Sequence, residues 1–158
     1  TRLVAICPPT ASDWPSPKSP GPPSLVVSLV SSAVSVADSV ADTPTSHLPF
    51  SPVIVAGDFV FVSGQASVDA KGQIVSDTFE GEFRRSIENM RKVLQAAGCD
   101  LKDVVQTRNY VRDPADVPRY NELYREYFTA PFPARTTITN CLPPTLRYEI
   151  EAVAVRKK

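Results

Sequence analysis

Apolar and polar residues alternate with the two-residue period of β-strands in the middle of the chain. Residues 53–55 and 59–64 are rich in valine and phenylalanine, and the Gly-Asp pair at 57–58 between them is a turn signal. This pattern predicts a β-hairpin. A second turn signal at residues 69–72 leads into a short predicted strand at residues 74–75.

Two helices are predicted by apolar residues that recur every three or four positions. The first runs from Phe79 to Ala97 and is followed by Gly98, the residue type that most often ends a helix. The second begins after Asp116, which we expect to cap it, and continues to about Phe128.

Three further strands complete the predicted sheet. Residues 104–111 form one of them, and the stretches that begin at Pro133 and at Tyr148 are expected to pair as a C-terminal hairpin with a Pro-Pro turn. The order β-β-β-α-β-α-β-β indicates an α+β fold in which a single sheet carries two helices on one face. The other face also needs a cover, and association of subunits is the natural one.

The two C-terminal strands bring candidate chemistry to the sheet, because they carry an arginine and two glutamates. Side chains alternate between the faces of a strand, so Arg135 shares a face with Thr137, and Glu149 shares a face with Glu151. Across a hairpin, the guanidinium is expected near a carboxylate in a small pocket. The arginine fork suits a substrate carboxylate and a glutamate suits the activation of water, whereas the structural alternative is an Arg–Glu ion pair.

Charge and rare residue types exclude several kinds of site. Lysine plus arginine and aspartate plus glutamate are equal at 17 each, so no basic field attracts a nucleic acid. The 3 cysteines lack a metal-binding spacing, and the single histidine, His47, is too few for a histidine triad or a multi-histidine metal site. We therefore expect no metal and no nucleic-acid partner. The unpaired cysteines favour a reducing, cytoplasmic compartment.

Residues 1–46 differ from the rest in being rich in proline, serine, valine and alanine. We expect them to be a disordered or dispensable extension of the domain at residues 47–158. The apolar segment at residues 25–37 resembles the hydrophobic region of a secretory signal, which leaves organellar or secretory targeting open as an alternative. This segment is too short and too rich in serine to span a bilayer, so no membrane association is expected.

Seven short motifs occur in a characteristic order between Pro49 and the C-terminus. They are Pro49–Ser51, Phe61–Gln65, Leu94–Gly98, Asp103–Thr107, Tyr120–Tyr124, Phe132–Arg135 and Glu149–Ala154. Each motif is weak alone, but their shared order and spacing make this stretch similar to the Rid family, the reactive intermediate deaminases also called the YjgF family. The resemblance implies a chorismate-mutase-like α+β fold, a homotrimer, and a site in the cleft between neighbouring subunits.

The same resemblance implies an activity, the hydrolysis of reactive enamine and imine acids such as 2-aminoacrylate and 2-iminobutyrate to 2-keto acids and ammonia. Pyridoxal-phosphate enzymes release such acids, and the hydrolysis itself is expected to need no cofactor. The resemblance implies that Arg135 grips the substrate carboxylate, that Glu149 places water, that Gly64 gives a backbone contact and that Asn121 lines the cleft. The ordinary alternatives are a bulge or close packing at Gly64, and an Asn121 that satisfies backbone groups near the helix start.

Two candidate substrate contacts depart from the family pattern. Phe50 stands where many relatives carry tyrosine, and Thr137 stands where a cysteine is often seen, while the loop at 139–144 is one residue short. Because loops shape a pocket, these differences bear on the substrate more than on the fold. They leave open a deaminase of a different, larger imino acid, and a non-catalytic trimer that binds small carboxylates or a protein.

Overall fold

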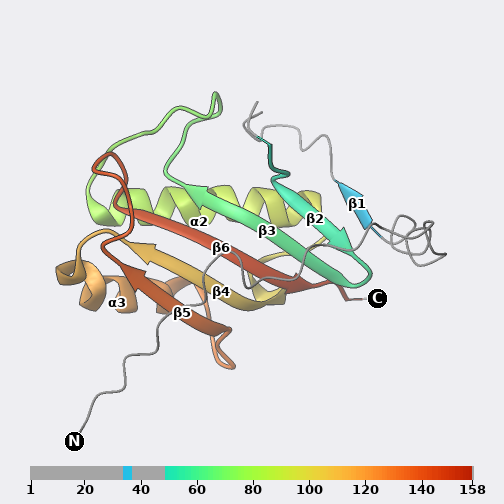
Figure 1. The fold of residues 1–158 in the computed structure, drawn as a ribbon. Helices are drawn as coiled ribbons and strands as arrows, with labels where there is room; N and C mark the ends of the chain where they lie inside the picture. Colours follow the sequence, from blue (N-terminus) through green and yellow to red (C-terminus); the bar gives the residue numbers. More distant parts are fainter. Residues whose placement is uncertain (1–33, 37–48, 158) are drawn as a thin grey trace, which may run out of the picture. The chain divides into compact units, whose positions relative to one another are not determined.

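A six-stranded sheet forms the centre of the described part of the chain, which comprises residues 34–36 and 49–157 of a computed structural model (Figure 1). The strands are β1 (Val34–Val36), β2 (Val53–Ala56), β3 (Phe59–Ala66), β4 (Val104–Val111), β5 (Ala134–Thr139) and β6 (Tyr148–Val155). The helices α2 (Phe79–Ala96) and α3 (Val117–Tyr127) cover one face, with 3-10 turns at Leu101–Asp103 and Pro114–Asp116. The predicted α+β class, with both helices on one face of one sheet, is confirmed.

The strands pair in the order β1-β2-β3-β6-β4-β5. β2 and β3 form the predicted antiparallel hairpin, and Gly57 at its turn adopts a left-handed conformation with φ 62°. β6 pairs antiparallel with both β3 and β4, whereas β5 pairs with β4 in parallel. The predicted C-terminal hairpin between β5 and β6 is therefore wrong.

β4 lies between the two C-terminal strands because α3 connects β4 to β5. A helical crossover brings the chain back in its original direction, so the next strand lies parallel to the previous one. β6 then occupies the place between β3 and β4, where it is paired on both sides. The alternation of side chains reports which face a residue occupies but not which strand lies beside it.

The structure differs from the sequence-based expectations at residues 74–75 and adds a short strand, β1. Residues 74–75 contribute only an isolated bridge between Ile74 and Val68, so the predicted third strand is wrong. β1 falls inside the predicted extension at residues 1–46, and its backbone pairs with the outer edge of β2. The rest of that extension lies outside the described residues, and its dispensability stays a prediction.

Local signals set the ends of the helices. The Thr78 hydroxyl caps the start of α2 by accepting a hydrogen bond from the Gly81 amide at 3.1 Å. Gly98 follows its last turn with φ 79°, which confirms it as the terminating glycine. Asp116 makes no side-chain cap at α3, and Asp113 instead caps the 3-10 turn before it. Neither α2 nor α3, the α-helices of the described part, is long and apolar enough to cross a membrane.

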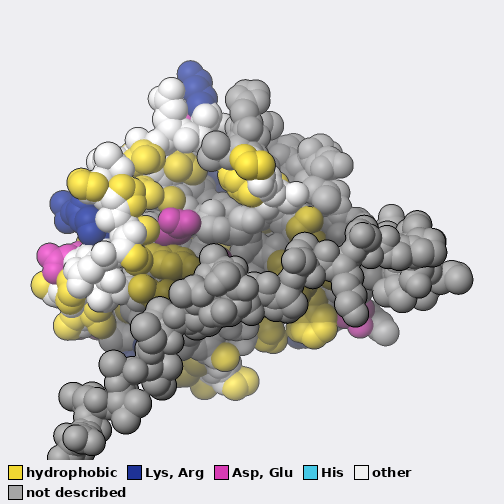
Figure 2. All heavy atoms as spheres, in the orientation of Figure 1, with side chains coloured by type: hydrophobic (Ala, Val, Ile, Leu, Met, Phe, Trp, Pro, Cys, Tyr) yellow, Lys and Arg dark blue, Asp and Glu magenta, His cyan; other side chains and the backbone are white. Residues whose placement is uncertain are grey.

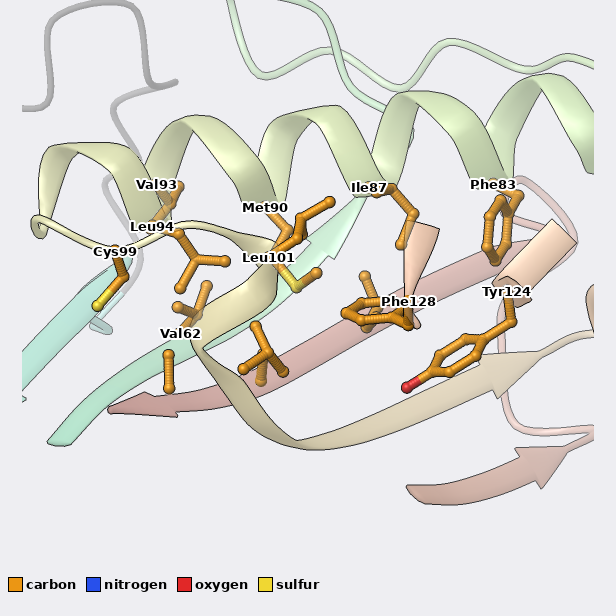
Figure 3. Close-up of a cluster of buried hydrophobic side chains, with 14 of the residues drawn as sticks. Val62, Phe83, Ile87, Met90, Val93, Leu94, Cys99, Leu101, Tyr124 and Phe128 are labelled. Atoms are coloured by element: carbon orange, nitrogen blue, oxygen red, sulfur yellow. The ribbon is translucent and has the colours of Figure 1, made fainter. Parts of the chain in front are cut away.

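The hydrophobic core lies between the helices and the sheet (Figure 3). Every second residue of β6 faces it, and the apolar side of α2 packs onto that face. Its fully buried members include Val60, Phe83, Ile87, Met90, Leu94, Leu123, Tyr148 and Ile150. Burying one such side chain contributes about 1.5–3 kcal/mol, so a one-residue slip of a strand would cost several of these contributions.

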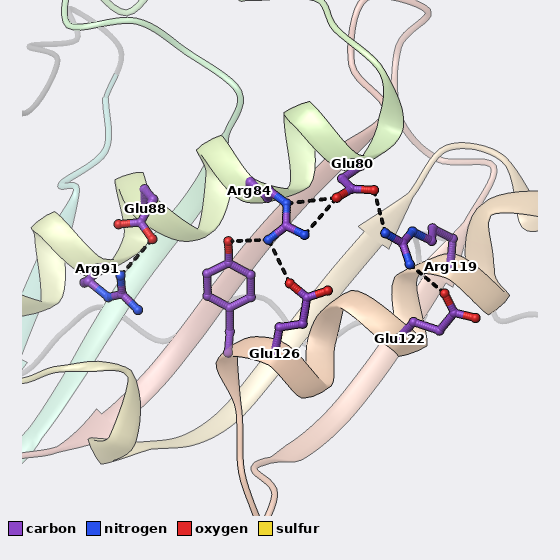
Figure 4. A network of polar contacts seen from close by, with 8 residues as sticks. Glu80, Arg84, Glu88, Arg91, Arg119, Glu122 and Glu126 are labelled. Carbon is purple, nitrogen blue, oxygen red and sulfur yellow. Dashed lines mark hydrogen bonds and ion pairs between the residues drawn. The ribbon is translucent and has the colours of Figure 1, made fainter.

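Charged side chains join α2 to α3 on the outer side of the helices (Figure 4). Arg84 contacts Glu80 and Glu126, both at 2.8 Å, and Arg119 contacts the same Glu80 at 2.6 Å. Exposed ion pairs are worth at most about 1 kcal/mol each. Their arrangement as a shared network nevertheless ties α3 to α2, and α3 is the helix that lies over β5.

The opposite face of the sheet, here called the open face, carries no described helix. Phe59 and Phe61 lie on it and are 50% and 46% exposed. Figure 2 shows this face, where apolar side chains gather beside an acidic group. Exposed apolar surface of this kind favours association with another protein surface.

Candidate active site

Arg135 lies on the helix-covered face of the edge strand β5, next to Thr107 of β4. Its guanidinium carbon is 5.0 Å from the ring centroid of Tyr120 and 5.0 Å from that of Tyr124, both of which belong to α3. Within the described residues, Arg135 takes part in no ion pair. Its positive charge is therefore not neutralised by a carboxylate of this part of the chain.

A cavity of about 250 Å³ opens beside Arg135. Its lining consists of Asn121, Tyr124, Arg125, Phe132, Pro133 and Arg135. Two predicted site residues, Arg135 and Asn121, are thus brought together.

The side chain of Asn121 is available to a ligand. Its amide has no hydrogen-bond partner in the described part of the chain, and only its backbone carbonyl is used, as an acceptor from Arg125 at 3.0 Å. The ordinary alternative, an asparagine whose side chain satisfies the backbone near the helix start, is not what the structure has. A guanidinium fork, a free amide and aromatic walls together suit a small carboxylate with an apolar body.

Thr137 faces the same side of β5 as Arg135 but does not line the cavity. It lies beside Tyr120, whose pKa burial raises to about 12, although the Thr137 hydroxyl and the Arg135 charge pull it down in part. Thr137 therefore acts on a neighbour of the arginine and not on the cavity itself.

A buried chain of hydrogen bonds lies behind the two tyrosines, and sequence reasoning missed it. The Tyr124 hydroxyl and Thr107 Oγ1 are 2.9 Å apart, and Asn109 Nδ2 donates to the same Oγ1 at 3.0 Å. The Tyr148 hydroxyl donates to Asn109 Oδ1 at 2.7 Å. The sequence did contain one indication of this chain, the polar residues Thr107 and Asn109 at alternate positions of an otherwise apolar strand face. Because buried polar groups need hydrogen-bond partners, such a pair predicts a buried hydrogen-bond network.

Glu149 lies on the open face, and Gly64 makes room for its carboxylate. A Cβ atom added at Gly64 would lie 2.0 Å from Glu149 Oε1, so the carboxylate can keep its present position only beside a glycine. The pairing of β3 with β6 is irregular between Val62 and Gln65, so the bulge expected as the ordinary role of Gly64 is present as well. Burial raises the pKa of Glu149, and the nearby negative charge of Glu151 raises it further.

Phe50 lies in the segment that runs beside the end of β3, close to Gly64. The Ser63 hydroxyl donates to the Ser51 carbonyl at 2.6 Å, which fixes the segment just before β2 against the end of β3. The Phe50 side chain is 52% exposed. It is available as an apolar rim to whatever binds near Gly64.

The predicted site residues therefore lie on both faces of the sheet. Arg135, Asn121 and Thr137 lie on the helix-covered side, whereas Gly64 and Glu149 lie towards the open face, and Phe50 lies in the segment beside the end of β3.

The expectation that Arg135 meets a glutamate across a hairpin is wrong. β4 separates the two strands, and the glutamates of β6 point to the other side of the sheet. The acid–base pair that does form on the open face joins Glu151 to Arg108 of β4 at 2.6 Å. A cavity of about 390 Å³ on this face is lined by both members of that pair and by Phe61 and Ser63.

No cluster of three or more histidine, cysteine, aspartate or glutamate side chains that could hold a metal ion occurs among residues 34–36 and 49–157. The charged groups singled out on the two faces are an arginine, which can bind an anion, and a carboxylate, which can accept a proton.

The fold is that of a chorismate-mutase-like α+β domain, and solved structures share it. The YjgF gene product of E. coli superimposes with a TM-score of 0.66 and 33% identity, over 73% of this chain and 94% of that one. The model of the family described as endoribonuclease L-PSP matches residues 40–156. The chain therefore belongs to the Rid, or YjgF, family, and the resemblance found in its motifs is confirmed.

Curated relatives give the family two kinds of name. A RutC family protein of Pyrococcus horikoshii is 39% identical over 111 residues, which cover 69% of this chain and 88% of that protein. The human 2-iminobutanoate/2-iminopropanoate deaminase is 38% identical over 110 residues, which cover 68% of this chain and 80% of the human protein.

Proposed function

We propose that this protein hydrolyses reactive 2-imino and 2-enamino acids, of the 2-iminobutyrate and 2-aminoacrylate type, to 2-keto acids and ammonia. The observation that carries the proposal is the Arg135 guanidinium, which has no ion-pair partner in the described chain and lines a cavity with the free amide of Asn121. A planar guanidinium binds a carboxylate through two parallel hydrogen bonds. The names of the related deaminases support the same substrate class.

Glu149 is the proposed base. Its carboxylate is partly buried and its pKa is raised, so it accepts a proton more readily than an exposed glutamate. A water molecule adds to C2 of the protonated imine while Glu149 takes one proton from that water and the C=N electron pair moves to nitrogen. Glu149 then returns the proton to nitrogen, the C–N bond breaks as the hydroxyl oxygen forms the keto group, and ammonia leaves with the hydroxyl proton as ammonium.

A complete site on this proposal needs two copies of the chain. Arg135 and Glu149 lie two strands apart, which is about 10 Å, and on opposite faces of the sheet, so one chain cannot place both on a substrate of three or four carbons. In the proposed homotrimer, the β5 edge of one copy meets the open face of the next near Gly64 and Glu149. The exposed phenylalanines of the open face supply apolar surface for this contact.

A mixing experiment tests both the activity and the shared site. The Arg135→Ala and Glu149→Gln variants are assayed alone and after coexpression, with imines generated by a pyridoxal-phosphate threonine dehydratase and keto acid followed over time. Each variant alone is expected to be inactive. In randomly mixed trimers about a quarter of the sites combine an intact arginine with an intact glutamate, so about a quarter of parent activity should return.

The outcomes separate the alternatives. Inactive mixed trimers would place both residues in one chain's site, and a stable monomer by light scattering would remove the shared site. A parent protein that binds 2-keto acids without accelerating imine hydrolysis would be a small-carboxylate-binding module. Running the assay with imines from several amino acids tests a preference for larger substrates, which the apolar Phe50 and Phe132, both 52% exposed, would favour.

A further inference from the structure

The arginines of the described chain are held in three different ways, and four of them, Arg112, Arg125, Arg147 and Arg156, donate to backbone carbonyls. Arg84, Arg85, Arg91, Arg108 and Arg119 all contact carboxylates within 4.0 Å. Arg135 contacts none in the described residues and lies instead over two tyrosine rings, each 5.0 Å from its guanidinium carbon. A long, charged side chain at an edge strand is thus ordered without an ion pair.

The two rings hold the guanidinium as neutral aromatic surfaces. Burial raises the pKa of Tyr120 and also that of Tyr124, so neither phenol ionises near neutral pH. A guanidinium over a neutral ring is attracted by the negative face of the π system, and the attraction grows when the site excludes water. A carboxylate at this place would order the arginine as well, but it would occupy the N–H donors that a substrate needs.

Tyr124 is itself fixed from behind. It is 3% exposed, and its hydroxyl joins Thr107 of β4, which is linked through Asn109 to Tyr148 of β6. All of these groups are buried, so the chain ties the ring to the centre of the sheet. Tyr120 has no such tie to the centre of the sheet, because within the described residues its buried hydroxyl makes no hydrogen bond of ordinary geometry, and the polar groups nearest to it are Thr137 and Arg135 of the edge strand.

We propose that Tyr120 and Tyr124 are positioning residues for Arg135, and that the buried chain from Tyr124 to Tyr148 fixes the ring that sets the direction of the guanidinium. The inference rests on the proposed function, because it assigns the freed N–H donors of Arg135 to a substrate carboxylate. Tyrosine serves at position 124 better than phenylalanine because only its hydroxyl reaches the sheet.

The test measures binding of 2-oxobutanoate, a keto acid of the product class, by calorimetry at fixed pH and salt. Tyr124→Leu removes the ring and is expected to weaken binding about fivefold, as loss of a cation–π contact at an exposed arginine does. Tyr124→Phe keeps the ring but loses the hydroxyl that reaches Thr107, so it should fall between the leucine variant and the parent, at about twofold. In turnover assays the leucine variant should raise KM more than it lowers kcat, because the carboxylate contact is made before and during the reaction.

Tyr127→Leu is the matched control. Tyr127 belongs to the same helix and its ring also lies near an arginine, with Arg84 5.9 Å from its centroid, but it does not line the cavity. Its removal should leave binding of 2-oxobutanoate unchanged. Melting curves by circular dichroism show which variants are folded.

A second measurement reports the contact itself. The Nε–H proton of Arg135 should resonate upfield of the other arginines because it lies over aromatic rings, and the shift should persist in Tyr124→Phe and shrink in a folded Tyr120→Leu or Tyr124→Leu variant. Parent-like binding and an unchanged resonance in either folded leucine variant would overturn the inference. If both leucine variants fail to fold, an unshifted Arg135 resonance in the parent protein overturns it in their place.

A different result would contradict the proposed function, independently of the role of the tyrosines. If Arg135→Ala binds 2-oxobutanoate as the parent does, the arginine does not hold the substrate carboxylate, whatever the resonance of its Nε–H proton shows about the tyrosines.

Discussion

The two faces of the sheet treat charge in opposite ways. On the helix-covered side, the positive charge of Arg135 rests on neutral rings and has no counter-ion in the described chain. On the open side, the negative charge of Glu149 lies near a second carboxylate, Glu151, which Arg108 neutralises. On the proposed function, one face offers a fixed anchor for an anion and the other offers a base with raised proton affinity, so each face would supply what the other lacks.

The largest expected effect comes from removing the anchor. Arg135→Ala should lower kcat/KM for imine hydrolysis about a thousandfold, because the substrate carboxylate loses both hydrogen bonds and its counter-charge. Arg135→Lys should behave almost like the alanine variant, since a point ammonium cannot reproduce the planar fork.

Arg119→Ala is the control for the anchor. It removes an arginine from α3 that is engaged in surface ion pairs, and it should leave kcat/KM nearly unchanged. Retention of most activity by Arg135→Lys, with the fold intact by circular dichroism, would assign Arg135 a structural role and leave the helix-covered face without an anchor.

The next largest effect comes from the base on the other face. Glu149→Gln should fold, keep its oligomer mass and lose about a hundredfold in kcat, since an amide of the same shape is a poor base. At neutral pH it should melt no lower than the parent, because burial opposes the charged form of Glu149 and the amide carries no charge.

Glu151→Gln sharpens the choice between the two carboxylates. It removes the partner of Arg108, so it should chiefly lower the melting temperature or weaken association, with smaller effects on turnover. A folded Glu149→Gln variant with parent turnover, beside an inactive Glu151→Gln trimer, would show that Glu151 and not Glu149 activates the water.

A smaller effect is expected at the glycine that makes room for Glu149. Gly64→Ala puts a methyl group where Glu149 Oε1 now lies, and the flexible end of that side chain can turn away, so the fold should survive while kcat falls about tenfold. Gly57→Ala gives the contrast. Position 57 has open space but a φ of 62°, so alanine there should cost about 1 kcal/mol of stability and leave kcat unchanged.

Kinetics and urea melts of both variants measure the contrast between the two glycines. A Gly64→Ala variant with parent kcat would mean that the position of the Glu149 carboxylate is not important for turnover.

The sequence identified Arg135 and Glu149 as candidate site residues, but it did not predict that they lie on opposite faces of the sheet. The spacing of apolar residues gives the elements, and the period of two correctly places Arg135 with Thr137 and Glu149 with Glu151. The same pattern could not predict which strands lie side by side. The pairing of β6 with β3 and β4 joins segments that are far apart in the sequence, and no local pattern indicates it.

The tyrosine contacts of Arg135 were equally hidden from the sequence. They depend on where α3 crosses β5, and Tyr120 and Tyr124 read simply as apolar positions one helical turn apart. Of the buried polar chain, only Thr107 and Asn109 left a trace, as polar residues at core positions of β4.

The smallest expected effect concerns the pH dependence of the open face. The charged and titratable groups around Glu149 are Glu151 on its own strand and Arg108 and Tyr110 on β4, while the facing part of β3 contributes none. The base must be deprotonated, so kcat/KM should fall as the pH drops through the raised pKa of Glu149.

Changing the charges around that base should move the acid limb of the profile in opposite directions. Arg108→Gln leaves the charge of Glu151 uncompensated, which opposes ionisation of Glu149 and shifts the limb to higher pH by about half a unit. Glu151→Gln removes that charge and shifts the limb to lower pH. These shifts should shrink at high salt because the groups are partly exposed. Identical profiles for all three proteins would show that the proton lost in this limb does not come from Glu149, and that the charges of the open face serve association alone.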